Sequence, residues 1–425
     1  IQQILSCHNP NNKIKVLLPS LINDQLFDFE AGENWRNIYK KYEEEGVDRN
    51  PFVKHFPRDG VEIIQYWINH EKAQKSWAEE FKIIYNPKNW FLEILEAQIL
   101  REDPDVVYNT TLNIIPYQFI QRIKQKVKKK IFWVSYYGVQ RVGEFVQFKE
   151  YDLFVTGFRE LEKELKTENQ KYEFLPHYFD DQLCKKTFNS KRSKSISFAG
   201  SLTLNLHDGN IFLYRRRVVE ALMDRCNMKT SSELNHDNNN PKEAIRQRIC
   251  KIRYEVYQLF NSLPKPFRFL NLLHGLKEIT DWEVEVKADH FFNPRLMKQV
   301  LPPSFGSQLY KLLNDSKITL NVHGHVKANY GKANFAAGNI RLFEGTGAGC
   351  CLLTDHLPHL EEFFIADEEI VTFRSKGEAV EKAKYLIENP KVAESIAKKG
   401  HHKAWKYHSS EIRAKQFAKV LKKHV

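Results

Sequence analysis

Residues 318–355, ITLNVHGHVKANYGKANFAAGNIRLFEGTGAGCCLLTD, decide the fold of the C-terminal half of this chain. The stretch contains two short apolar runs, 318–322 and 350–354, each of the length of a buried strand. Between them, Asn339 can cap a helix that begins at Ile340 and ends near Gly347 or Gly349. A strand, a helix and a second strand in this order predict parallel pairing in an α/β sheet.

The loop after the first of these strands carries groups that suit an anionic ligand. In an open parallel sheet, ligands bind outside the carboxyl ends of the strands, where helix N-termini present free N–H groups. His323 and His325 follow the strand, and Lys327 adds positive charge. We therefore expect a diphosphate here, with Asn339 at the start of the helix. The alternative for both histidines is a surface position without a ligand, and no third residue at suitable spacing makes them a zinc pair.

Arg341 and Glu344 are three residues apart in the expected helix and share one face of it. A carboxylate one turn into such a helix can accept hydrogen bonds from both ribose hydroxyls of a nucleotide. The alternative is an ion pair on a solvated helix surface, which is the usual result of this spacing.

Short apolar runs alternate with amphipathic stretches along the whole chain, which predicts two α/β lobes. A basic, polar stretch at 184–194 predicts the link between them, and the polar residues 230–240 predict an exposed loop. We expect an N-terminal lobe over 1–190, a C-terminal lobe over 191–405 and a final helical segment over 406–425. The expected strands are 14–19, 61–67, 106–109, 131–135, 153–156 and 173–176 in the first lobe, and 195–199, 318–322, 350–354 and 370–373 in the second.

The amino-acid composition limits the class of binding partner and the cellular compartment that we expect for this protein. The formal charge of +12 favours an anionic partner, and nucleic acid, an anionic membrane or a phosphorylated small molecule would each satisfy it. No apolar stretch approaches the roughly 20 residues of a membrane span. The six cysteines form no CxxC pair, which favours a reducing compartment and a cytoplasmic protein. The chain begins at Ile1 rather than Met, and removal of a leader or an upstream domain is one explanation.

Three segments in a fixed order resemble a known family: N-I-R-L-F-E (339–344), G-C-C-L-L-T-D (349–355) and E-E-F (361–363). This order is similar to the C-terminal lobe of bacterial GT-B fold glycosyltransferases of the group 1 type, specifically the CgeB-like branch. The resemblance is clearest over residues 310–420, extends back to Ser195 and is weak before it. It implies two Rossmann-like lobes that face a central cleft, with a C-terminal helix that crosses back to the N-terminal lobe.

The resemblance also implies roles for individual residues. Glu344 would hold the donor ribose, and Arg341 would lie near the donor phosphates or support Glu344. Gly200 and Ser201 match the family's Gly-Ser turn near the diphosphate, and Arg215 begins the run 215–217 on the following helix. Three consecutive arginines span too wide an arc for all of them to face one ligand.

The implied activity is transfer of a sugar from a nucleotide-sugar donor to a glycan, lipid-linked saccharide or protein acceptor. The implied setting is bacterial surface polysaccharide, lipopolysaccharide or glycoconjugate synthesis. No cofactor besides the donor substrate is expected. No DxD motif is present in the expected C-terminal lobe, which predicts activity without a metal ion.

One departure from the family leaves the stereochemistry open. Many retaining relatives carry a second Glu eight residues before the ribose-binding one, where this chain has Ala336. An inverting reaction needs a general base in the N-terminal lobe. The loop after the first strand offers four carboxylates, of which Asp28 and Glu30 are preferred over Asp24 and Glu33. His177, near the end of that lobe, is a further cleft candidate or a packing residue.

Other classes of function remain as alternatives. A nucleotide-sugar epimerase would use the same fold. A non-enzymatic nucleic-acid-binding protein would suit the charge, but no ordered basic and aromatic module is present. The basic segment 114–130 predicts a peripheral contact with an anionic membrane on the inner face, or else an ordinary helix whose basic end precedes a strand.

Overall fold

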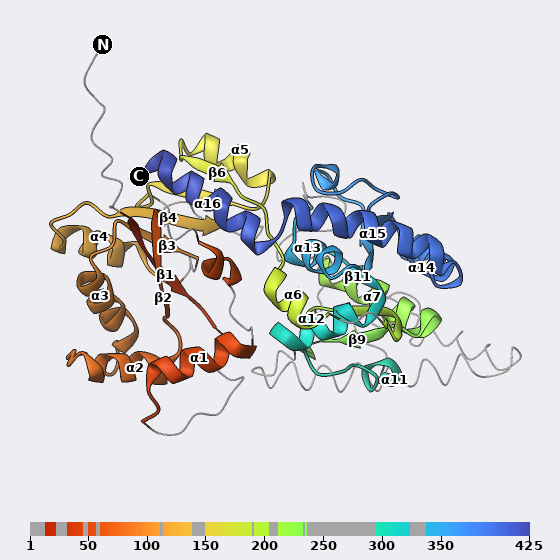
Figure 1. Ribbon diagram of the computed structural model, residues 1–425, viewed down its shortest axis with the longest axis horizontal. Helices are drawn as coiled ribbons and strands as arrows, with labels where there is room; N and C mark the ends of the chain where they lie inside the picture. Colours follow the sequence, from red (N-terminus) through yellow and green to blue (C-terminus); the bar gives the residue numbers. More distant parts are fainter. Residues whose placement is uncertain are drawn as a thin grey trace, which may run out of the picture.

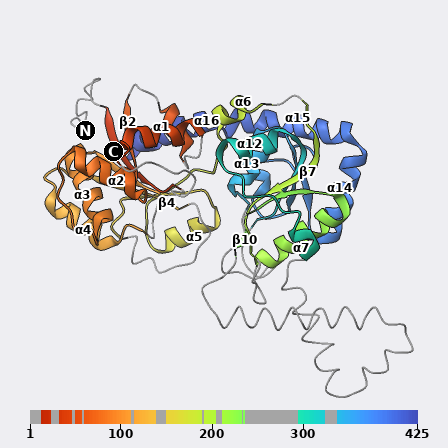
Figure 2. The ribbon, with the colours of Figure 1, turned by 90° about the horizontal axis from the view of Figure 1, so that it is seen from below.

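The computed structural model describes residues 13–22, 32–45, 50–56, 60–110, 114–137, 149–188, 191–203, 211–232, 234–235, 294–323 and 337–425. These residues form two α/β lobes, each built on a parallel sheet (Figure 1), and the predicted fold class is confirmed. Figure 2 shows the two lobes side by side, with a long helical segment running along both.

The sheet of the N-terminal lobe has the strand order β2-β1-β3-β4-β5-β6, and each neighbouring pair is parallel. Its strands are β1 (Ile14–Ser20), β2 (Val61–Trp67), β3 (Val106–Asn109), β4 (Phe132–Tyr137), β5 (Leu153–Thr156) and β6 (Tyr172–Phe174). The described helices of this lobe are α1 (Trp35–Glu45), η1 (Pro51–His55), α2 (Glu71–Glu80), α3 (Trp90–Glu102), α4 (Tyr117–Lys126) and α5 (Glu160–Thr167).

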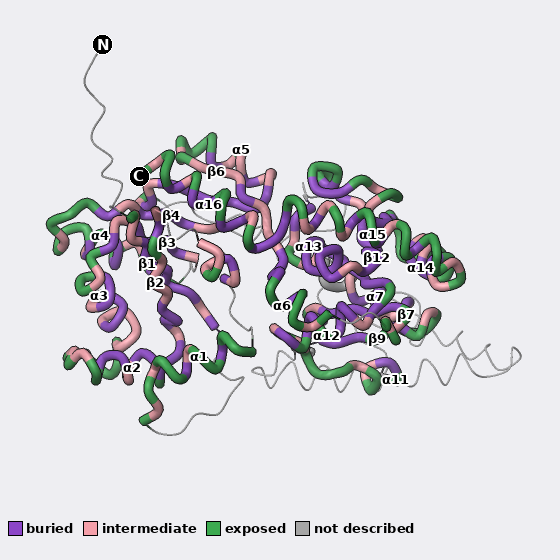
Figure 3. The backbone as a smooth tube through the Cα atoms, viewed as in Figure 1, coloured by how far each residue is buried: buried purple, intermediate pink, exposed green. Residues whose placement is uncertain are grey.

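Successive side chains of these strands face opposite sides of the sheet and are buried on both. Leu17 packs into the core shared with α2, α3 and α4, whereas Val16 and Leu18 pack into the core on the other face. Burial on both sides explains why the strands read as continuous apolar runs in the sequence. The buried interior of both sheets and the exposed outer faces of the helices can be followed in Figure 3.

The sheet of the C-terminal lobe has the order β13-β12-β11-β7-β9 and is also parallel. Its strands are β7 (Lys194–Ala199), β9 (Lys229–Ser231), β11 (Ser316–Asn321), β12 (Cys351–Asp355) and β13 (Val371–Phe373). Every strand predicted for either lobe is present, with each end within two residues of the prediction. The region from residue 230 was expected as a loop, and this prediction is wrong at its start. There β9 forms an edge strand, too short and polar to show alternation, and β8 (Leu202–Thr203) pairs with β10 (Leu234–Asn235).

Helices cover both faces of this second sheet. The core on one face contains side chains of α7 (Ile211–Cys226) and α14 (Lys376–Glu388), with α11 (Pro294–Met297) at its edge. The core on the other face contains α6 (Asp181–Lys186), α12 (Gly306–Asn314) and α13 (Ile340–Gly347), together with the end of α15 (Pro390–Tyr407) and the turn η4 (Leu360–Glu362). Helix α6 overlaps the predicted link at 184–194 and lies before the predicted lobe boundary at residue 190, yet its Leu183 and Cys184 pack with the C-terminal lobe.

Within the described residues the chain passes between the lobes twice, and the two passages are hydrogen-bonded to each other. The Phe179 N–H donates to the His408 carbonyl at 3.1 Å, and the Ser410 N–H donates to the Phe179 carbonyl at 2.9 Å. After the second passage, α16 (Ser410–His424) lies across the N-terminal lobe (Figure 1). Its Phe417 and Leu421 are buried in the core of that lobe, so the predicted return of the C-terminal helix is confirmed.

A buried carboxylate joins the two passages to the N-terminal lobe. Asp181 accepts hydrogen bonds from the Ser410 hydroxyl and from the Glu411 N–H, the latter at 3.2 Å. His55 Nε2 of η1 lies 3.1 Å from the same carboxylate. Burial alone would raise the pKa of Asp181, but these partners outweigh it and hold the pKa below its usual range.

Among the described helices, none is long and apolar enough to cross a membrane.

Candidate functional site

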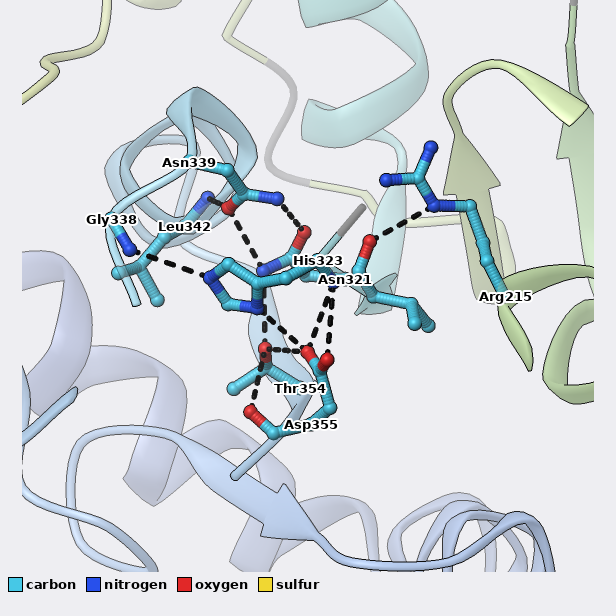
Figure 4. Close-up of polar contacts among 9 residues, drawn as sticks. Arg215, Asn321, His323, Gly338, Asn339, Leu342, Thr354 and Asp355 are labelled. Carbon is cyan, nitrogen blue, oxygen red and sulfur yellow. Dashed lines mark hydrogen bonds and ion pairs between the residues drawn. The ribbon is translucent and has the colours of Figure 1, made fainter. Parts of the chain in front are cut away.

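The carboxyl ends of β7, β11 and β12 meet at one edge of the C-terminal sheet, and polar residues follow each of them. Gly200 and Ser201 follow β7, His323 lies two residues beyond β11, and Asp355 ends β12. Because the three strands are parallel neighbours, residues distant in sequence become adjacent here. Figure 4 shows this edge from close by.

Helix α13 begins at the same edge, and the last residue of β11 fixes its start. The Asn339 side chain accepts a hydrogen bond from the Leu342 N–H at 3.3 Å, so it caps the helix as predicted. The Asn339 amide donates to Asn321 Oδ1 at 2.8 Å, and the Asn321 amide donates back to Asn339 Oδ1 at 3.1 Å. This reciprocal pair aims the free N–H groups of the helix N-terminus at the space beyond the strand ends.

His323 and Asp355 form a buried pair beside this cap. His323 is 3% exposed and Asp355 is fully buried, so the alternative of a surface histidine is wrong. The Nδ1 atom of His323 lies 2.7 Å from Asp355 Oδ1, and the His323 backbone N–H donates to both carboxylate oxygens at 3.1 and 3.2 Å. The Gly338 N–H points at His323 Nε2 from 3.4 Å. A carboxylate can only accept, so Nδ1 carries the proton and Nε2 is the acceptor for Gly338.

Arg215 links the ends of β7 and β11 from α7. Its Nε donates to the Val322 carbonyl at 3.0 Å, and its Nη1 donates to the Ser201 carbonyl at 3.2 Å. Figure 4 shows Arg215 and Asn339 on opposite sides of the end of β11. Burial lowers the pKa of Arg215 to about 10, against the opposing effect of the Asp355 charge and with a further lowering by Arg341. The guanidinium stays protonated at neutral pH, so it supplies a fixed positive charge at this edge.

Arg341 and Glu344 pair within α13, but not on a solvated surface. Arg341 Nη1 lies 2.5 Å from Glu344 Oε2, and Glu344 is only 7% exposed. The alternative of a solvated ion pair is therefore wrong. Burial raises the pKa of Glu344, which the Arg341 charge opposes and the Asp180 charge reinforces. A carboxylate in this setting has lost water and can accept hydrogen bonds from hydroxyl groups of a ligand.

The remaining predicted residues fall into two groups. His325, Lys327, Asp28 and Glu30 lie outside the described residues, so their roles stay predictions. His177 is described: its Nδ1 lies 3.1 Å from the Tyr136 hydroxyl, and its carbonyl accepts from Arg413 of α16 at 2.9 Å. These partners place it at the passage between the lobes.

Two residues of this edge were not predicted as site residues. Asn321 and Asp355 are the last residues of adjacent parallel strands, and that position alone is a signal for a ligand-binding edge. Within the described ranges, no group of three or more metal-ligating side chains comes together. The predicted independence of metal stays a prediction.

Part of the chain matches a known protein family. Residues 270–419 match a family model described as glycosyl transferase-like. No curated protein matches the chain in sequence.

Solved structures resemble the chain over nearly its whole length. It is similar to sucrose-phosphate synthase from Thermosynechococcus elongatus, with 12% identity, a TM-score of 0.51, and coverage of 97% of this chain and 99% of that one. It is similar to a glycosyltransferase from Rickettsia africae, with 12% identity, a TM-score of 0.53 and coverage of 97% and 99%. It is also similar to Anabaena HepE in complex with UDP-glucose, with 11% identity, a TM-score of 0.52 and coverage of 96% and 99%. At such identities the likeness establishes the fold, two Rossmann-like lobes of the GT-B type.

Proposed function

We propose that this GT-B chain is a glycosyltransferase whose C-terminal lobe binds a nucleotide-sugar donor at the shared edge of β7, β11 and β12. The observation that carries the proposal is the start of α13, where a capped helix N-terminus, Arg215 and the buried Glu344 surround one edge of a parallel sheet. The glycosyl transferase-like match over residues 270–419 includes this edge from β11 onward.

The site offers separate partners for the two ends of a nucleoside diphosphate. Backbone N–H groups at the start of α13 and the charge of Arg215 suit the diphosphate. Glu344, one turn further along the helix, suits the two ribose hydroxyls. Gly200 and Ser201 follow β7 at the same edge, and the family resemblance assigns them to the surroundings of the diphosphate. The complex of HepE with UDP-glucose supports a nucleotide sugar as the ligand class.

Catalysis at such a site depends on placement of donor and acceptor and on stabilisation of the departing diphosphate. Arg215 and the helix N-terminus can supply that stabilisation without a metal ion. The CgeB-like branch, the stereochemistry and the base Asp28 or Glu30 stay predictions. So do a cytoplasmic location and an acceptor from bacterial polysaccharide, lipopolysaccharide or glycoconjugate synthesis.

Contact with an anionic membrane through α4 also stays a prediction, and the surroundings of the helix bear on it. Arg122 and Lys126 both pair with Glu96, with the Arg122 contact at 2.7 Å, and Lys124 pairs with Glu150 at 3.0 Å. These ion pairs use cations that a membrane would otherwise engage, which favours the ordinary packing role of α4. Salt-sensitive co-sedimentation with phosphatidylserine vesicles, absent with neutral vesicles, would establish the membrane contact.

A thermal-shift panel tests the proposed donor site. UDP, GDP, dTDP, ADP and CMP are each added with and without magnesium to the wild type, to Glu344→Ala and to Glu368→Gln. Glu368 is an exposed carboxylate of the same lobe and serves as the control position. A ligand that binds only the folded state raises the melting temperature. We expect one nucleotide to stabilise the wild type and Glu368→Gln but not Glu344→Ala. No shift with any nucleotide would refute the proposal and direct the search to nucleic acid.

An epimerase on the same fold is separated from a transferase by product analysis. An epimerase changes the nucleotide sugar without an acceptor, whereas a transferase releases the nucleotide as the sugar moves to an acceptor. A change in the sugar of the intact donor would contradict the proposed transfer.

A further inference from the structure

We propose that His323 and Asp355 are positioning residues, which act on the donor through the turn 337–339 rather than by contact with it. Their assignment to the donor rests on the proposed function, whereas their action on the turn rests on the structure of the protein alone. The turn connects to the start of α13, so its position determines where the N-terminal N–H groups of that helix point.

Two parallel links hold this turn to the ends of two strands. Asn339 is tied to Asn321 of β11 by the reciprocal amide pair. Gly338 is tied to His323, which is itself held by Asp355 at the end of β12. The Asn321 amide also donates to the Thr354 hydroxyl at 3.1 Å, so the two links share one polar network. Both strand ends therefore fix one turn.

Asp355 determines what His323 can do. The Asp355 carboxylate accepts a hydrogen bond from the N–H at Nδ1 of His323. The other ring nitrogen, Nε2, therefore carries no proton and can accept a hydrogen bond from the Gly338 N–H that faces it. An imidazole with the opposite tautomer would set an N–H against an N–H and push the turn away. The occupied Nε2 is also the reason to assign His323 a positioning role, although the sequence suggested donor contact.

The turn has little freedom to move in another direction. Gly338 has φ +139°, a conformation that other residues rarely adopt, and a Cβ atom here would lie 3.2 Å from the Gly157 carbonyl of the opposite lobe. The Ala337 N–H donates to the Pro358 carbonyl at 2.9 Å. The turn is thus confined between the two lobes, and the His323 bond selects its position within that space.

Two amide substitutions of His323 separate this role from plain core packing. A Gln amide reaches the place of Nε2 and can accept from Gly338, whereas an Asn amide reaches the place of Nδ1 and keeps only the Asp355 contact. Asp355→Asn keeps the size of the side chain but can donate to Nδ1, which reverses the tautomer of His323. Ser375→Ala removes the cap of α14 instead and controls for a general loosening of the lobe.

The first readouts need no nucleotide. Hydrogen exchange of residues 337–342 should accelerate roughly two- to twelvefold in His323→Asn and Asp355→Asn, the range for one lost hydrogen bond. His323→Gln and Ser375→Ala should leave that exchange near the wild type. Long-range ¹H–¹⁵N spectra should show the proton of His323 on Nδ1 in the wild type and on Nε2 in Asp355→Asn. Equal exchange in His323→Gln and His323→Asn, or an Nε2 proton in the wild type, would overturn the proposal.

Nucleotide affinity then tests the link to the donor. Titration calorimetry with the nucleotide that stabilises the wild type should show affinity weakened roughly two- to twelvefold in His323→Asn and nearly unchanged in His323→Gln. Accelerated exchange without loss of affinity would overturn the donor part of the proposal. A wild type that binds no nucleotide refutes the proposed function instead, and the exchange and tautomer results still decide whether His323 positions the turn.

Discussion

Glu344→Gln is the substitution that tests the proposed ribose contact most directly. The amide has the shape of the carboxylate, and its oxygen can still accept a hydrogen bond from Arg341. In the wild type, Arg341 Nη1 lies 2.5 Å from Glu344 Oε2. The change removes the negative charge and one acceptor, so the fold should persist while the interaction with two ribose hydroxyls weakens.

The magnitude follows from the surroundings of the carboxylate. A hydrogen bond to a charged group is worth about 1.5–3 kcal/mol, against about 0.5–1.5 kcal/mol for a neutral one, so two ribose bonds would lose about 2–3 kcal/mol. Burial of Glu344, which raises its pKa, means that the charged form already carries a desolvation cost that the amide avoids. We therefore expect a net loss of about 1–3 kcal/mol, or roughly 5- to 150-fold in donor affinity.

Isothermal titration calorimetry of the wild type, Glu344→Gln and the control Glu368→Gln measures this difference, and thermal denaturation checks the fold. The pH dependence adds an independent test. Donor affinity of the wild type should be constant at high pH and fall as the pH drops through the raised pKa of Glu344, whereas that of Glu344→Gln should not show this fall. Unchanged affinity in Glu344→Gln, or the same acid loss in both proteins, would show that the ribose does not meet this carboxylate.

Three further predictions concern the passage between the lobes and the role of metal. Asp181→Asn should lower stability by about 1–3 kcal/mol at neutral pH. The pKa of Asp181 is depressed in the folded state, so its contribution is present above the unfolded value of about 3.9 and is lost as the pH falls. The difference in urea unfolding between the two proteins should therefore shrink in acid, and a constant difference would contradict this assignment. Gly347→Ala should destabilise by about 1–3 kcal/mol, because its Cβ would lie 2.4 Å from Phe179 Cγ, and an unchanged melting temperature would show that Phe179 can move aside. Sugar transfer should persist in EDTA, and loss of turnover that magnesium restores would show that a metal ion takes part.

The architecture was predictable because a buried strand must consist of apolar residues, and such runs are visible in the sequence. Strands covered on both faces must be apolar throughout, so β1, β3, β5 and β12 stand out as short apolar runs between polar segments. The start of α13 was predictable for a similar local reason, since an Asn side chain satisfies the N–H groups at a helix start. The edge strand β9 and the six-residue helix α6 are too short to show a period, and neither was predicted.

The candidate site was predictable only in part. The spacing of Arg341 and Glu344 placed both on one helix face, but spacing alone could not separate a buried pair from a solvated one. The burial of Glu344 in the folded C-terminal lobe, where its side chain is 7% exposed, decided that question. His323 could likewise be placed at a strand end without any indication of its partner.

The sequence by itself determined the elements, the lobes and the sheet edge at which a ligand can bind, since these depend on hydrophobic periodicity and local capping. The tertiary structure alone decided which polar groups meet. Asp355 lies 32 residues from His323, and Ser410 lies 229 residues from Asp181. The sequence does not show whether a given carboxylate is exposed to water or paired with a histidine. Its charge state and its partner depend on which strands and chain passages the fold brings beside it.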